Sequence, residues 1–214
     1  MMDIQAALDC LVPNPVCELN FQTPFQLLVA VVLSAQCTDA RVNKVTNSLF
    51  QKYPSAKEFA NLSVDELGKE IYSLGFFRTK AKNLIALSKS LIENFDGKVP
   101  CTMKELTTLP GVGRKTASVV LAEAFNIPAF AVDTHVFRVA NRLGIGDEKS
   151  PDACEAALKN FFPKENWAKT HLQMVIFGRY TCKAQNPKCT DCPFQSICKY
   201  FQKKDKKCFL IKLK

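Results

Sequence analysis

The sequence predicts an all-α protein with room for a substantial core. Apolar residues recur at helical spacing along the 214 residues, and no segment shows the alternation of a half-buried strand. No unit of about 20–50 residues repeats, as it would in a solenoid. The length allows one large domain or two small ones.

Helix starts in the N-terminal half are marked by capping residues. One short helix is expected within residues 1–20, and Thr23 with Pro24 then gives a cap and a first-turn proline. The helix that follows is apolar almost all round, so we expect it to be buried and to run through Gln36. Capping-box spacing marks two further starts, at Ser63 with Glu66 and at Thr102 with Glu105. Other helices are expected at 39–52, 55–60, 63–73 and 80–94.

The stretch 106–144 holds a pattern suited to binding an anion. Pro110, Gly111 and Gly113 predict a tight turn that another backbone can approach closely, and a helix is expected at 114–125. A glycine turn leading into a helix start presents free N–H groups at the positive end of the macrodipole. We therefore expect Gly111, Gly113 and Arg114 to form a phosphate site.

Two residues of this stretch are candidates for chemistry. Lys115 falls in the first turn of the helix, where the macrodipole, together with any burial, lowers the pKa of an amine. A neutral lysine amine is a nucleophile that forms Schiff bases. Asp133 is placed to cap the next helix. For an isolated lysine and aspartate, the ordinary interpretation is a solvated charge and a cap, but the surrounding motif favours a catalytic pair.

Further helices are expected at 151–161 and 164–180, and no apolar run is long enough to span a bilayer. The N-terminus has no signal segment, so we expect an intracellular protein, in the cytoplasm or at the nucleoid if bacterial. The formal net charge of +9 points to a polyanionic partner, nucleic acid before membrane, although many basic proteins bind neither.

Four of the ten cysteines are clustered as C-x6-C-x2-C-x5-C, at Cys182, Cys189, Cys192 and Cys198. Structural zinc normally uses two close pairs, and only one is present, so the spacing favours a [4Fe–4S] cluster over zinc, with two disulfides third. Lysines surround these cysteines, and we expect Lys188 to meet DNA phosphates. The lysines beyond Lys203 read as a solvated, disordered tail.

The motifs together resemble the endonuclease III family of helix-hairpin-helix DNA glycosylases and AP lyases. The resemblance rests on LPGVGRKTA at 109–117, VDTHVFRV at 132–139 and the four cysteines preceded by GRY. LSAQCTD at 33–39 and ELNFQTPFQLL at 18–28 also match, so the similarity extends from about Glu18 to Lys199. It implies a [4Fe–4S] cluster and a protein that works as a monomer.

The resemblance also implies a two-lobed fold and a DNA site. A six-helix barrel domain with the hairpin would span 22–127, and residues 1–21 with 128–214 would form a second lobe holding the cluster, with DNA in the cleft between them. Because the target sugar is inaccessible in the stack, the damaged nucleotide must flip out. Gln36 matches the residue that fills the vacated space. Phe76 stands where the family has an apolar wedge, although a core aromatic is an equal interpretation. His135 would contact DNA or hold the loop.

The activity that the resemblance implies is base-excision repair of double-stranded DNA carrying an oxidised pyrimidine or an abasic site. Lys115 would attack C1′ with help from Asp133, and β-elimination would follow. Related mismatch glycosylases lack this lysine and only hydrolyse the base bond. A hairpin module that binds DNA without catalysis is the alternative from another class. Two departures from the family pattern are Gln185 and Asn186, where basic residues are common; Cys37, beside Gln36, reads as a packing residue.

Overall fold

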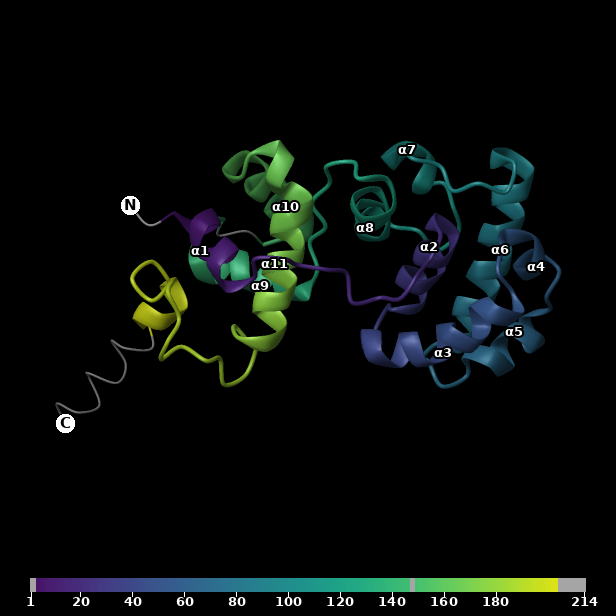
Figure 1. Ribbon diagram of the computed structural model, residues 1–214, viewed down its shortest axis with the longest axis horizontal. Helices are drawn as coiled ribbons and strands as arrows, with labels where there is room; N and C mark the ends of the chain where they lie inside the picture. The colour runs from purple at the N-terminus through teal and green to yellow at the C-terminus, as the bar shows by residue number, and fades with distance from the viewer. Residues whose placement is uncertain (1–2, 147–148, 204–214) are drawn as a thin grey trace. The chain divides into compact units, whose positions relative to one another are not determined.

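The computed structural model describes residues 3–146 and 149–203. This part of the chain contains the α-helices α1 to α11, a short helical segment at 199–203 and one 3₁₀ turn, Lys164–Asn166, and it contains no strand, so the all-α prediction is confirmed. The helices fall into two compact units (Figure 1). The hairpin unit is Cys17–Ala129, and the cysteine unit combines the described residues of Met1–Val16 and Phe130–Lys214. The predicted lysine tail beyond Lys203 lies outside the described residues.

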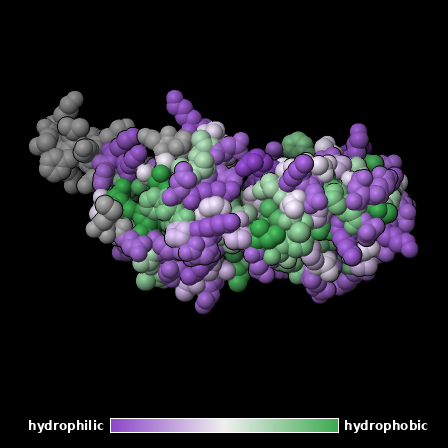
Figure 2. Space-filling view, turned by 90° about the horizontal axis from the view of Figure 1, so that it is seen from above, coloured by the Kyte–Doolittle hydropathy of each residue, from purple (hydrophilic) through white to green (hydrophobic). Residues whose placement is uncertain are grey.

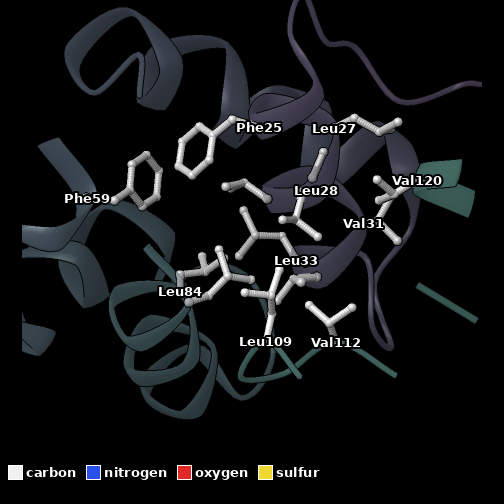
Figure 3. Close-up of a cluster of buried hydrophobic side chains, with 14 of the residues drawn as sticks. Phe25, Leu27, Leu28, Val31, Leu33, Phe59, Leu84, Leu109, Val112 and Val120 are labelled. Carbon is white, nitrogen blue, oxygen red and sulfur yellow. The ribbon is translucent and has the colours of Figure 1, made fainter. Parts of the chain in front are cut away.

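The hairpin unit is built around α2, Pro24–Leu33, whose residues are all buried after the first. As an all-apolar helix requires, α2 is surrounded, packing against α3, α6 and α8 (Figure 1). Figure 3 shows its side chains meeting Phe59, Leu84, Leu109, Val112 and Val120 from the neighbouring segments. Phe25 and Phe59 meet edge to face, with ring centroids 5.3 Å apart. This apolar core supports the turns that carry Gln36, Phe76 and Gly111.

The remaining helices of the hairpin unit follow the predicted order. They are α3 (Asp39–Lys52), α4 (Ala56–Ala60), α5 (Val64–Ile71), α6 (Phe77–Phe95), α7 (Met103–Leu106) and α8 (Arg114–Phe125). With α2 this makes seven helices in a unit whose residues are all described, where the resemblance implied six; α7 is a single turn of four residues. Both α4 and α5 pack against α6, as Figure 1 shows.

The helix expected at 164–180 begins at Trp167, after the 3₁₀ turn, and two helix ends of the hairpin unit also differ from the prediction by three residues. The buried helix ends at Leu33 rather than Gln36, because Ser34 caps it and the chain turns, with the Cys37 N–H donating to the Ser34 carbonyl at 3.0 Å. Helix α6 begins at Phe77, three residues earlier than expected. The capping box at Ser63 is confirmed, and Ser55 forms another with Glu58 that the sequence analysis did not single out. Thr102 caps α7 with its side chain.

The cysteine unit joins the two ends of the described chain. It contains α1 (Ile4–Leu11), α9 (Thr134–Leu143), α10 (Pro151–Phe161) and α11 (Trp167–Tyr180), with α11 packed against both α9 and α1. Polar contacts also fasten α1 to α11: the amide of Gln5 donates to Gln173 at 3.1 Å, and Lys169 pairs with Asp9 at 2.6 Å. The apolar core of this unit is separate from that of the hairpin unit.

The face of the molecule that Figure 2 shows is mixed in character. Hydrophilic side chains cover most of the face that Figure 2 shows, with apolar ones interspersed. Among the described residues, no helix has the length and apolar character needed to cross a membrane.

Candidate functional site

The hairpin turn places Gly111 where glycine is required. Its φ is +79°, and a Cβ there would come within 3.0 Å of the Asn83 side chain. The Val112 N–H donates to the Leu109 carbonyl at 3.1 Å, and the Val112 side chain is buried in the core. Gly113 differs: its φ is −94° and a Cβ would meet nothing within 4 Å. Gly111 is therefore fixed by the fold, whereas the fold gives no reason for glycine at 113.

The turn leads directly into α8, and the start of this helix is exposed. Gly113 is the N-cap, and no described side chain caps the helix. The first bond within the helix runs from the Ala117 N–H to the Gly113 carbonyl at 2.9 Å, so the N–H groups before it have no partner inside α8. Lys115 and Arg114 are both exposed beside this helix start. Free N–H groups at an exposed helix start are the geometry that an anion site needs.

Gln36 and Phe76 share an unusual backbone. Both have a φ of 57°, in the left-handed region, although neither is glycine. Such a conformation costs about 1–2 kcal/mol for an L-residue and is concentrated at functional sites. Both side chains are exposed, Phe76 to 67%. The interpretation of Phe76 as a core aromatic is therefore wrong, and the exposure agrees with a wedge.

Asp133 begins α9 as its N-cap, as predicted. Its Oδ1 accepts from the N–H groups of His135 and Val136, at 2.8 Å each. Its Oδ2 accepts no hydrogen bond from the described residues, so one carboxylate oxygen is held and the other is available. The side chain is partly buried.

Arg138 connects this cap to the cysteines. Its Nε donates to the Cys182 carbonyl at 3.0 Å, and its Nη2 donates to the Gly178 carbonyl at 2.7 Å and approaches His135 Nδ1 at 3.2 Å. Because a guanidinium only donates, Nδ1 of His135 accepts, which leaves the ring N–H on Nε2 when the imidazole is neutral. Burial lowers the pKa of Arg138, an effect that Cys182 opposes. His135 is thus held by the loop network of Arg138, one of its two predicted roles.

The four clustered cysteines line one pocket, together with Arg142, Phe194 and neighbouring residues. Burial raises the pKa of the Cys192 thiol, and the three other cysteines raise it further. Arg142 Nη1 donates to Cys182 Sγ at 3.3 Å, and its guanidinium lies 4.1 Å from the centre of the Tyr200 ring. Among the described residues, no three Cys, His, Asp or Glu side chains are placed to hold a single metal ion.

The segment between the first two cysteines turns sharply. Asn186 has a φ of 47°, which asparagine tolerates better than lysine or arginine, so its presence has a backbone reason. Lys188 is exposed, and its N–H donates to the Thr181 carbonyl at 3.0 Å. Arg142 holds the same segment through the carbonyls of Lys183, at 2.7 Å, and Ala184, at 3.2 Å.

The sequence analysis missed Arg138 and Arg142. They are four residues apart in α9 and therefore lie on one face of this helix. Asp133 caps the same helix. The sequence shows this spacing. It does not show the hydrogen-bond partners of the two arginines, which lie about forty residues further along the chain.

The chain matches known protein families in two places. Residues 29–164, more than half of the chain, match the HhH-GPD superfamily of base excision DNA repair proteins. Residues 182–198 match the iron-sulfur binding domain of endonuclease III, and this range begins and ends at the outer two of the four cysteines. The class is thus that of a helix-hairpin-helix base-excision repair protein with an iron–sulfur domain.

Curated relatives and solved structures support the same class of protein. Endonuclease III of Bacillus subtilis (strain 168) is 53% identical over 196 residues, covering 91% of this chain and 90% of that protein. A non-covalent endonuclease III–DNA complex matches with a TM-score of 0.92 and 46% identity, covering 96% of this chain and 100% of the other. A trapped covalent endonuclease III–DNA intermediate matches with a TM-score of 0.91, at the same identity and coverage. The chain belongs to the endonuclease III family.

Membership confirms the predicted fold class, the enzyme class of DNA glycosylase and AP lyase, and the [4Fe–4S] cofactor. The residues present fit that cofactor. Burial and, to a smaller extent, the three neighbouring cysteines raise the pKa of the Cys192 thiol, and the positive charge of iron would offset both effects in this pocket of four thiols. Arg142 adds a hydrogen bond to a ligand sulfur, as outer partners of metal sites commonly do.

Proposed function

We propose that this protein removes oxidised pyrimidines from double-stranded DNA and then cuts the strand, with Lys115 as the nucleophile and Asp133 as its carboxylate partner. The enzyme works on DNA inside the cell. The observation that carries the assignment is Lys115 itself: an exposed amine in the first turn of α8, directly after a glycine turn suited to phosphate.

The chemistry follows from these two side chains. The neutral amine of Lys115 attacks C1′ of the flipped nucleotide, and the bond from C1′ to the base breaks, so that the base leaves with the bonding electrons. Asp133 stabilises the positive charge that develops on the sugar and accepts a proton from the attacking nitrogen. The free Oδ2 is the oxygen for this role, since Oδ1 holds the helix cap.

Strand cleavage uses the Schiff base formed after ring opening. The iminium withdraws electrons and acidifies the C2′ proton; loss of this proton expels the 3′ phosphate by β-elimination. Water then hydrolyses the imine and frees Lys115. The cluster, when bound, ties the four thiolates of 182–198 together and so fixes the segment that carries Lys188. Gln36 and Phe76 occupy the duplex where the nucleotide has left, and Gly111, Gly113, Arg114, His135 and Lys188 contact the DNA.

Borohydride trapping on a duplex with one thymine glycol tests this assignment. The wild type is expected to give a covalent protein–DNA adduct, because borohydride reduces the imine. Lys115→Ala and Lys115→Arg are both expected to give none, although Lys115→Arg keeps the charge and should bind the duplex about as well as wild type.

Two outcomes would contradict the roles given. Base release by the wild type without an adduct would make the enzyme a monofunctional glycosylase. Strand cleavage retained in Lys115→Arg would show that Lys115 is not the nucleophile and serves at most as a phosphate contact.

A further inference from the structure

Lys80, in α6, is a buried lysine that the proposed reaction does not use. It is 5% exposed, and lysine is almost never buried unless it is paired. Its Nζ donates to the carbonyls of Leu33, at 2.9 Å, and Ala35, at 2.8 Å, and lies 3.4 Å from Cys37 Sγ. Each of the three N–H bonds of the ammonium therefore has an acceptor.

These acceptors enclose Gln36. Leu33 is the last residue of α2, and its carbonyl is one of those a helix end leaves without a partner. The ammonium also stands at the negative end of the α2 macrodipole, which stabilises it there. Ala35 and Cys37 directly flank Gln36, whose φ of 57° is unfavourable for a residue with a side chain. Lys80 thus holds the turn on both sides of Gln36.

Lys80 also lies one helical turn after Phe76, the other strained position. The Lys80 N–H donates to the Phe76 carbonyl at 3.0 Å, in the first turn of α6. Phe76 has the same left-handed φ as Gln36, and no side chain among the described residues caps the helix that it begins. The side chain of Lys80 therefore acts on the turn of Gln36 alone, because the backbone bond to Phe76 would form whatever side chain stood at position 80.

We propose that Lys80 is a positioning residue whose side chain holds Gln36 in one fixed arrangement, ready to fill the duplex when the damaged nucleotide flips out. The proposal rests on the function proposed above, and Lys80 itself touches no DNA. Fixing this turn before binding means that the entropy of ordering it is not lost at the flipping step. A lysine with a purely structural role, by contrast, would only donate hydrogen bonds to the carbonyls at the end of α2. Its replacement would then lower every activity equally.

Two substrates separate these interpretations. One is a duplex with a single thymine glycol, which must flip and leaves a space to fill; the other is single-stranded DNA with one abasic site, which leaves no such space. In single-turnover assays, Lys80→Met is expected to slow excision from the duplex roughly 10- to 100-fold, the scale of a misplaced catalytic geometry. Strand cleavage and borohydride trapping on the single strand should change less than about threefold, because Lys115 is untouched.

Matched variants complete the test. Lys89→Met removes an exposed lysine from the same helix and should leave both rates near wild type. Gln36→Ala should slow the duplex reaction, and adding Lys80→Met to it should cost little more, since both changes affect one element. If Lys80→Met does not fold, Lys80→Arg serves instead: its planar fork cannot match the three acceptors, and the same selective loss is expected.

Each other outcome overturns the proposal. Equal losses on both substrates would show a structural role, and no loss on either would show that the turn of Gln36 needs no support from Lys80. Additive losses in the double variant would show that Lys80 does not act through Gln36. If the wild type acts on neither substrate, the proposed function itself fails, a result that is recognised before any Lys80 variant is compared.

Discussion

At the scale of single residues, Asp133 combines a structural and a chemical role that can be separated. Asparagine caps helices as well as aspartate does but carries no charge, so Asp133→Asn should keep the fold and lose the carboxylate. Excision should fall roughly 10²- to 10⁴-fold, the usual contribution of a positioned acid or base, with the melting temperature unchanged. Single-turnover excision and thermal unfolding measure the two effects.

The alanine variant provides the contrast. Asp133→Ala should show the same loss of excision and in addition lose the cap, worth about 1 kcal/mol. An Asp133→Asn enzyme with wild-type excision would show that only the cap matters.

How well the role of a single residue could be predicted from the sequence depends on how far along the chain its contact partners lie. The Asp133 cap was predictable because its partners are two and three residues away. The exposure of Phe76 was not, because the sequence left wedge and core interpretations equal. Lys80 was not singled out either: its three acceptors are more than forty positions earlier in the chain, and only the packed core brings them together.

At the scale of elements, the two hairpin glycines should respond differently to alanine. Gly111→Ala should cost about 2 kcal/mol of stability, since a left-handed alanine alone costs about 1–2 kcal/mol and its Cβ would also press on Asn83. Gly113→Ala meets open space, and its cost is at most about 1 kcal/mol for a poorer cap.

DNA affinity should instead be sensitive to the change at Gly113. A methyl group at 113 stands at the helix start where a phosphate would approach, so Gly113→Ala should weaken binding of a duplex with an abasic analogue more than its small stability loss explains. Fluorescence anisotropy and thermal unfolding provide the two measurements. Unchanged affinity in Gly113→Ala would place the phosphate elsewhere.

The contact between α9 and α11 depends on Gly178. A Cβ there would lie 2.9 Å from His135 Cβ and 3.3 Å from its Cα, too close without moving α9. Gly178→Ala should therefore destabilise the protein by about 1–3 kcal/mol, as overpacking does, and should slow excision by displacing the loop of Asp133. At roughly 2–4 °C per kcal/mol for a chain of this size, the melting temperature records the first effect.

Gly68→Ala is the control for this change. Gly68 lies within α5, and a Cβ would make only ordinary contacts with Phe77 at 3.5 Å. Alanine should stabilise this helix by up to about 1 kcal/mol. A Gly178→Ala protein as stable as Gly68→Ala would show that α9 and α11 can separate without cost.

Helix identity was predictable from periodicity, whereas two helix ends of the hairpin unit were not. The apolar pattern of α2 continues towards Gln36, but the left-handed turn stops the helix at Leu33. Similarly, Phe76 starts α6 early without any capping residue. Both errors fall at strained positions, where tertiary contacts such as those of Lys80 override local preference.

At the scale of the whole molecule, the net charge of +9 predicts strongly salt-dependent binding. Each phosphate neutralised contributes about 0.9 to the slope of log affinity against log salt. Lys188→Gln should therefore reduce the slope by about 0.9, while Lys89→Gln, which lies outside the proposed contacts, should leave it unchanged. Filter binding of an undamaged duplex between roughly 50 and 200 mM salt measures both, and equal slopes for wild type and Lys188→Gln would remove Lys188 from the interface.

The cysteine unit is built from two segments that are far apart in the sequence, which affects how the chain folds during synthesis. Helix α1 packs on α11 through pairs such as Gln5 with Gln173, 168 positions apart. On the ribosome, α1 therefore emerges without its partner and waits roughly 8–30 s at about 5–20 residues per second. The hairpin unit, which is continuous in sequence, can fold during that interval. We expect the nascent chain to acquire its phosphate-binding turn first and to close the unit that binds the cluster only when the last helix has been synthesised.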